Sequence, residues 1–93
     1  MINYGKRILL GQLGSNGDCL YTTILARQIK QDYPNCHLTW AVSSICRGTV
    51  EENPFVDEIW EISLAGWADM AAAWYDFESQ AKSRAERGDF DEI

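Results

Sequence analysis

Apolar and polar positions form alternating blocks along the chain, and these blocks predict three β-strands separated by helices. The run over 7–13 is mostly apolar, which is typical of a strand buried on both faces, and we expect it to lie centrally in the sheet. Alternating apolar positions predict further strands over 37–43 and, more weakly because acidic residues interrupt the pattern, over 56–62. Strands that alternate with helices form βαβ units, so the pattern predicts a parallel sheet with right-handed crossovers.

Three helices are predicted between and after these strands. The first ends just before Pro34, because the residue preceding proline disfavours helix. Its apolar side, which we expect to lie on the sheet, comprises Leu20, Tyr21, Ile24, Leu25 and Ile29. A short helix is expected within 45–52, before an Asn-Pro pair that breaks it.

The third and longest helix is predicted over 66–86 and ends at Gly88. Its single apolar stripe comprises Trp67, Met70, Trp74, Phe77 and Ala81. We expect this stripe to cover the sheet. A seam for self-association is the alternative, because paired helices use the same spacing.

A further strand pattern begins at Phe90, where the sequence stops after three more residues. We therefore expect the sheet to continue beyond this piece. The predicted fold class is α/β, a parallel sheet flanked by helices. At 93 residues the chain is one domain at most, so residues 1–93 are expected to form a single, incomplete domain.

Composition narrows the classes of protein and of partner. Apolar residues make up 46% and charged residues 24%, as in globular chains, and a net charge of −6 argues against nucleic acid as a partner. The longest apolar run is too short to span a membrane, and no secretory signal is visible. Three cysteines without C-x-x-C spacing predict buried thiols in a reducing cytoplasm and no metal site, with a reactive Cys19 at a helix N-terminus as the alternative.

The glycine-rich turn between the first strand and the first helix, "GQLGSNGD" over 11–18, carries the candidate chemistry. Its spacing differs from the G-x-G-x-x-G of dinucleotide sites, and no lysine follows Gly17 as a P-loop requires. Gly14 and Gly17 would let the backbone bend tightly and approach a ligand at the helix N-terminus. From spacing alone, Asp18 is either the helix N-cap or a carboxylate held at the edge of the sheet, and N-capping is favoured.

Several segments together resemble the start of the family 9 glycosyltransferases, typified by the ADP-heptose:lipopolysaccharide heptosyltransferases. The matching elements are "ILLGQLGSNGD", a Thr22-Thr23 pair, "ARQIKQDYP", "HLTWAV", "ENPFVDEIWEI" and "GDFDEI". They occur in the family's order and cover nearly the whole chain. The chain departs from the family's pattern at Ile24, where a proline is usual, and at 11–12.

The resemblance implies a GT-B enzyme, inverting and without a required metal, built of two Rossmann-like domains. This chain would be its truncated, Rossmann-like N-terminal half-domain, on the acceptor side. It implies Asp18 as the general base, with Gly14, Ser15, Asn16, Gly17 and Thr22 expected to contact substrate. The donor would be a nucleotide-sugar such as ADP-heptose, held by a C-terminal domain missing here, and the acceptor a lipopolysaccharide-type saccharide. The chain alone is expected to be inactive and to need no cofactor of its own.

Two other functions stay open from the sequence. One is a stand-alone interaction module that forms a homodimer through the 67–81 stripe or the C-terminal edge strand. The other is a small nucleotide-binding module with measurable affinity for ADP.

Other side chains are expected to be structural. The only histidine, His37, has no evident partner and should be solvated, and neighbouring Asp57 and Glu58 should point to opposite faces. The acids of the C-terminus should form a solvated end. Tryptophans at 60, 67 and 74 are more typical of core packing than of a sugar-stacking site.

Overall fold

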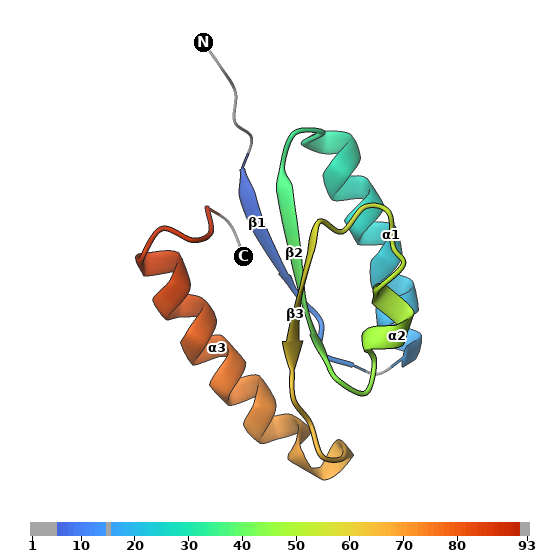
Figure 1. Cartoon of the computed structure of the whole chain (residues 1–93), viewed down its shortest axis with the longest axis vertical. Helices are drawn as coiled ribbons and strands as arrows, with labels where there is room; N and C mark the ends of the chain where they lie inside the picture. The colour runs from blue at the N-terminus through green and yellow to red at the C-terminus, as the bar shows by residue number, and fades with distance from the viewer. Residues whose placement is uncertain (1–5, 15, 92–93) are drawn as a thin grey trace.

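The computed structural model describes residues 6–14 and 16–91, which form a three-stranded parallel sheet with helices on both faces (Figure 1). In chain order the elements are β1 (Arg7–Gly11), α1 (Asn16–Asp32), β2 (His37–Ser43), α2 (Arg47–Val50), β3 (Glu58–Ile62), the 3-10 turn η1 (Trp67–Asp69) and α3 (Met70–Glu86). Helices α1 and α2 cover one face and α3 covers the other (Figure 1). The predicted α/β fold with a parallel sheet is confirmed.

The strand order is β1-β2-β3, so β2 is the central strand of the described sheet. Arg7 pairs with His37 at the start of the β1–β2 ladder, and Thr39 pairs with Glu58 at the start of the β2–β3 ladder. The expectation that β1 lies centrally is wrong for the described residues. The chain that reaches the outer edge of β1 comes from the other end of the sequence, since the Asp91 amide donates to the Arg7 carbonyl at 2.7 Å.

Each sheet face has its own apolar core, because successive residues of a strand point to opposite sides. Ile8 lies in the core under α1 and α2, whereas the adjacent Leu9 lies in the core under α3. Both are nearly inaccessible to solvent, at 6% and 1% exposed, which confirms that β1 is covered on both faces. In β2 every residue from Leu38 to Ser43 is buried.

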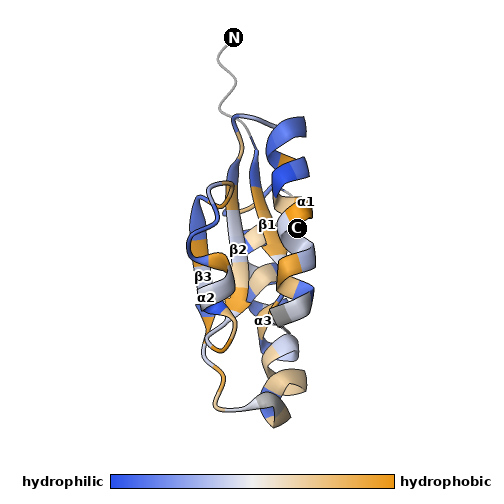
Figure 2. Cartoon of the chain, turned by 90° about the vertical axis from the view of Figure 1, so that its right-hand side faces the viewer, coloured by the Kyte–Doolittle hydropathy of each residue, from blue (hydrophilic) through white to orange (hydrophobic). Residues whose placement is uncertain are grey.

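Helix α1 lies on the sheet by a different side from the one predicted. Its buried residues are Cys19, Thr22 and Ala26, with Ile29 and Lys30 partly buried. Four of the five apolar residues expected against the sheet face solvent instead, namely Leu20, Tyr21, Ile24 and Leu25. The indole of Trp40 is fully buried in the same core as Cys19 and Ala26, so small α1 side chains fit there and large ones do not. Figure 2 shows apolar segments along the outer side of α1.

Helix α3 packs on the opposite face as predicted. Ala73, Phe77 and Ala81 are buried, while Met70 and Trp74 pack partly exposed against the same core. This stripe is therefore core, and it is not an exposed seam for self-association. The side chain of Trp67 lies outside the described part of the structure.

The end of α3 is closed by a Schellman motif, in which residues beyond the helix donate back to its last carbonyls. Gly88 has a positive φ of 94°, and its amide donates to the Ala85 carbonyl at 3.0 Å. The Asp89 amide donates to the Arg84 carbonyl at 2.9 Å. This confirms Gly88 as the terminator, because a left-handed backbone favours glycine.

No helix among residues 6–14 and 16–91 is long and apolar enough to cross a membrane.

Candidate functional site

The turn between β1 and α1 is anchored by hydrogen bonds to the central strand. The Gln12 amide donates to the Ala41 carbonyl at 3.1 Å, and the Ser43 amide donates to the Leu13 carbonyl at 3.0 Å. The indole Nε1 of Trp40 donates to the Gln12 carbonyl at 3.1 Å. Because Leu13 is also fully buried, the chain leaves β1 along a defined path and delivers the start of α1 to the carboxyl edge of the sheet.

Asp18 is exposed and lies in the first turn of α1. Helix α1 begins at Asn16, so Asp18 is a residue of the helix and not its N-cap, and the N-cap prediction is wrong. A carboxylate in the first turn interacts favourably with the positive end of the helix dipole. Because α1 begins just beyond the carboxyl end of β1, Asp18 lies at the edge where ligands bind to open parallel α/β sheets.

The other predicted substrate contacts lie around this turn with different exposure. Gly14 precedes α1 and is partly buried, Asn16 is the first residue of the helix, and Gly17 is exposed. Ser15 lies outside the described residues. Thr22 is one helical turn beyond Asp18 and is only 9% exposed, on the sheet side of α1.

Gly17 does not make the tight bend that was expected of it. Its backbone is helical, and a Cβ added there would meet no atom within 4 Å. Gly17 therefore lies at an open part of the surface. The contribution of these residues to substrate binding stays a prediction.

Cys19, next to Asp18, is not a reactive thiol. It is fully buried, and its Sγ donates to the Gln12 carbonyl at 3.8 Å. Burial, with the nearby Cys46 and Asp18 adding to it, raises the pKa of Cys19 to about 12, so the thiolate is strongly disfavoured. All three cysteines are free and buried, as small apolar side chains.

The loops after β2 and β3 reach the same edge of the sheet. The Ser44 amide donates to the Ile62 carbonyl at 2.9 Å, and the Leu64 amide donates to the Ser44 hydroxyl at 3.0 Å. Arg47, at the start of α2, forms ion pairs with Glu51 at 3.5 Å and Glu61 at 3.1 Å. These hydrogen bonds and the Arg47–Glu61 ion pair thus join the two loops at the edge of the sheet where α1 begins.

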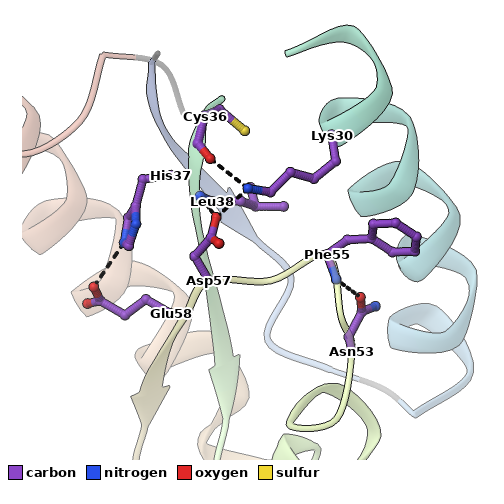
Figure 3. Close-up of polar contacts among 8 residues, drawn as sticks. All are labelled: Lys30, Cys36, His37, Leu38, Asn53, Phe55, Asp57 and Glu58. Atoms are coloured by element: carbon purple, nitrogen blue, oxygen red, sulfur yellow. Dashed lines mark hydrogen bonds and ion pairs between the residues drawn. The ribbon is translucent and has the colours of Figure 1, made fainter. Parts of the chain in front are cut away.

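A polar network that sequence reasoning missed lies at the opposite, amino-terminal edge (Figure 3). The Asp57 carboxylate accepts hydrogen bonds from the Leu38 amide at 2.7 Å and from Lys30 Nζ at 2.6 Å, and Lys30 also donates to the Cys36 carbonyl at 2.6 Å. Burial disfavours the charged form of Asp57, but the Leu38 hydrogen bond and then Lys30 outweigh it and hold its pKa below the usual range. This network ties α1 to β2 and to the start of β3.

His37 also has a partner that the sequence did not indicate. Its Nε2 lies 3.2 Å from Glu58 Oε1, because parallel pairing brings the starts of β2 and β3 together (Figure 3). Both side chains are about half exposed, so this is a surface contact. Asp57 points toward Leu38 and Glu58 toward His37, in opposite directions as expected (Figure 3).

Two of the C-terminal acids are at least partly exposed, as expected, and they also form ion pairs that the sequence did not indicate. Asp91 accepts hydrogen bonds from the amide and the guanidinium of Arg7, at 2.8 Å and 3.2 Å, and these bonds lower its pKa. Asp89 forms ion pairs with Arg84 and Arg87, and its pKa is lowered for the same reason. Trp60 packs between Phe77, Phe90 and the Arg84 guanidinium, as expected of a core tryptophan.

Among the described residues, no three His, Cys, Asp or Glu side chains gather where they could hold a metal ion.

The arrangement of strands and helices is similar to that of a solved glycosyl transferase. The crystal structure of the glycosyl transferase family 9 from Veillonella parvula DSM 2008 superposes with a TM-score of 0.65 and 22% sequence identity, over 85% of this chain. This chain shares its fold with part of that enzyme. It spans only 23% of the length of that glycosyl transferase chain. No family model and no curated protein matches the sequence.

Proposed function

We propose that this chain is the N-terminal, acceptor-side part of a family 9 glycosyltransferase of GT-B architecture, and that Asp18 is its general base. The observation that carries the proposal is the exposed carboxylate in the first turn of α1, at the carboxyl edge of a parallel sheet. The motif around it, "LGSNGD", is the one through which the sequence resembles the family, and the fold likeness agrees with that resemblance.

A carboxylate at such an edge can act as a general base. In an inverting transfer the acceptor hydroxyl attacks the anomeric carbon from the face opposite the leaving diphosphate, and a base removes the hydroxyl proton. Asp18 would accept that proton. A Cβ at the neighbouring Gly17 would meet no atom within 4 Å, so the surface next to Asp18 in the sequence is open to solvent.

The donor half of the reaction belongs to residues beyond this chain. A chain that spans 23% of its structural neighbour is expected to lack the domain that would hold a nucleotide-sugar such as ADP-heptose. The contact of Asp91 with the outer edge of β1 supports a sheet that continues past residue 91 on that side. We therefore propose that the 93-residue chain transfers no sugar by itself, and that the complete enzyme acts in the cytoplasm on a lipopolysaccharide-type acceptor.

The acceptor side can be tested with the chain as it is. Titrating the isotope-labelled chain with a lipopolysaccharide-core saccharide should shift the amide resonances of Gly14, Gly17 and Asp18, whereas ADP should shift none of them. Saccharide-dependent shifts confined to other surfaces would contradict the proposed site. Transfer from ADP-heptose by the 93-residue chain would contradict its proposed inactivity.

The role of Asp18 is tested in the protein completed by its C-terminal domain. Asp18→Asn should lower kcat by about 10²- to 10⁴-fold, the usual contribution of a general base. Asp32→Asn, at the other end of the same helix, is the control and should leave kcat unchanged. Equal kcat values for the two variants would exclude Asp18 as the base.

A further inference from the structure

The hydrogen-bonded ladder between β1 and β2 becomes irregular just before the glycine-rich turn. Up to the last residue of β1 the two strands pair in a regular parallel register, and the Gln12 amide continues the ladder by donating to the Ala41 carbonyl. A regular parallel ladder would next join the Ser43 amide to the Gln12 carbonyl. The Ser43 amide donates instead to the Leu13 carbonyl, at 3.0 Å. The ladder thus passes over one carbonyl, as at a β-bulge, a feature that is over-represented next to active sites.

Two side chains take the place of the missing strand partner at the Gln12 carbonyl. The indole Nε1 of Trp40 donates to this oxygen at 3.1 Å, and Cys19 Sγ donates to it at 3.8 Å. Trp40 is fully buried in the central strand, so close packing fixes its indole in the core under α1. A carbonyl inside the fold without a partner is destabilising, and the Trp40 N–H therefore stabilises the irregular ladder.

The same carbonyl connects the central strand to the first turn of α1. Cys19 is fully buried and directly follows the exposed Asp18 in this turn. Trp40 of β2 and Cys19 of α1 therefore bond to one oxygen atom of the segment that joins β1 to α1. This junction sets where the first turn of α1, and with it Asp18, stands relative to the sheet.

We propose that Trp40 is a positioning residue for Asp18, acting through the Gln12 carbonyl and Cys19. Its N–H fixes the path of the turn and thereby the place of the Asp18 carboxylate at the carboxyl edge of the sheet. A general base must lie within hydrogen-bond reach of the proton that it removes, so a small displacement lowers kcat more than it weakens substrate binding. This inference rests on the proposed role of Asp18 as the base.

Steady-state kinetics of the protein completed by its C-terminal domain tests the positioning role. Trp40→Phe keeps an aromatic ring and removes the N–H. It should lower kcat about tenfold or more and change the KM for the acceptor by less than about twofold. Trp60→Phe, the same change where the ring stacks on Phe90 in the core under α3, is the matched control and should leave kcat unchanged. Equal kcat values for the two variants would overturn the proposal.

A double-variant cycle distinguishes positioning of the base from a general disturbance of the fold. In an Asp18→Asn background the base is already lost, so adding Trp40→Phe should lower kcat by less than about twofold more. The full tenfold loss in that background would show that Trp40 does not act through Asp18, and would overturn the proposal. An unchanged kcat in Asp18→Asn alone would instead overturn the proposed base, and this inference with it.

The hydrogen bond itself is tested by NMR in the wild-type 93-residue chain. The indole N–H of Trp40 should exchange with solvent as slowly as the buried amides of β2, and that of the partly exposed Trp74 should exchange faster. Equally fast exchange of the two indoles would overturn the proposal. The Trp40→Phe chain should keep its circular-dichroism spectrum and show shifted amide resonances at Gly14, Gly17 and Asp18, and unshifted resonances there would count as a second contradiction.

Discussion

At the scale of single residues, Gly11 shows how closely the sheet and α3 approach each other. A Cβ built at this position, the last of β1, would lie 2.7 Å and 2.8 Å from two ring carbons of Phe77. Phe77 is only 4% exposed and also contacts Trp60 and Trp74, so its ring has little room to move. The glycine is therefore required by packing and not by backbone conformation.

Gly11→Ala should destabilise the chain by about 1–3 kcal/mol, the usual cost of forcing an extra methyl group into a packed core. Gly48→Ala is the control, because a Cβ there meets no atom within 4 Å. Urea denaturation measures both. In a Phe77→Leu background the cost of Gly11→Ala should fall, and an unchanged cost would show that the ring is not the obstacle.

The Asp57 carboxylate should make stability depend on pH in the acid range. Its pKa in the folded chain lies below the ordinary 3.8, so its contribution is complete above about pH 5 and is lost as the pH falls through the folded pKa. Asp57→Asn should cost about 1 kcal/mol at pH 7, since the charge-assisted hydrogen bonds are partly exposed to solvent. The difference between the variant and the wild type should shrink at pH 3. A difference of the same size at both pH values would contradict this account. Asp76→Asn, on the exposed side of α3, is the control.

At the scale of elements, α1 lies on the sheet by a side that its own apolar pattern did not predict. Its sheet side is made of small residues, and its large apolar residues face outward. The fully buried Trp40 occupies the volume that larger α1 side chains would need. Near the C-terminal end of α1, Lys30 forms an ion pair with Asp57, which holds that end of the helix against the sheet.

Ala26→Leu should therefore destabilise the fold by about 1–3 kcal/mol, because Ala26 is completely buried between α1 and the sheet. The same change at Ala72, which is exposed on α3, serves as the control and should alter stability by less than about 0.5 kcal/mol. Thermal unfolding of the two variants compares them directly. Equal stabilities would mean that the α1 interface has room to spare.

At the scale of the whole molecule, β2 is the most enclosed strand of the described sheet. This strand pairs on both edges and is buried on both faces, whereas β3 pairs on one edge only and its residues are exposed or half-buried. The two ends of the described chain also meet. Phe90 packs in the core under α3, and the Asp91 amide donates to the Arg7 carbonyl at the start of β1.

Amide hydrogen exchange should reveal this gradient. The hydrogen-bonded amides of Trp40, Ala41 and Val42 should exchange only by global unfolding, and the bonded amides of β3 should exchange faster through local opening. Exchange measured by NMR as a function of denaturant separates the two classes. Uniform protection of β2 and β3 would contradict a stability gradient across the sheet.

Much of this architecture was predictable because it depends on local pattern. The predicted strand over 37–43 coincides with β2, and the predicted helix over 66–86 contains α3 and ends before Gly88 as expected. Alternation of period two and spacing of 3.6 specify which residues can share one face of an element. The glycine-rich turn likewise placed Asp18 beside the start of α1.

The sequence by itself determined the order and type of the elements, the parallel sheet and the candidate carboxylate, since each of these follows from side chains near one another along the chain. Only the tertiary structure decided which side of α1 lies on the sheet, because that depends on the volume of Trp40, a residue distant in sequence. It also decided the partners of Asp57, His37 and Asp91, which are brought together by strand pairing and chain closure. Contacts between distant segments depend on volume and register, and a local pattern contains neither.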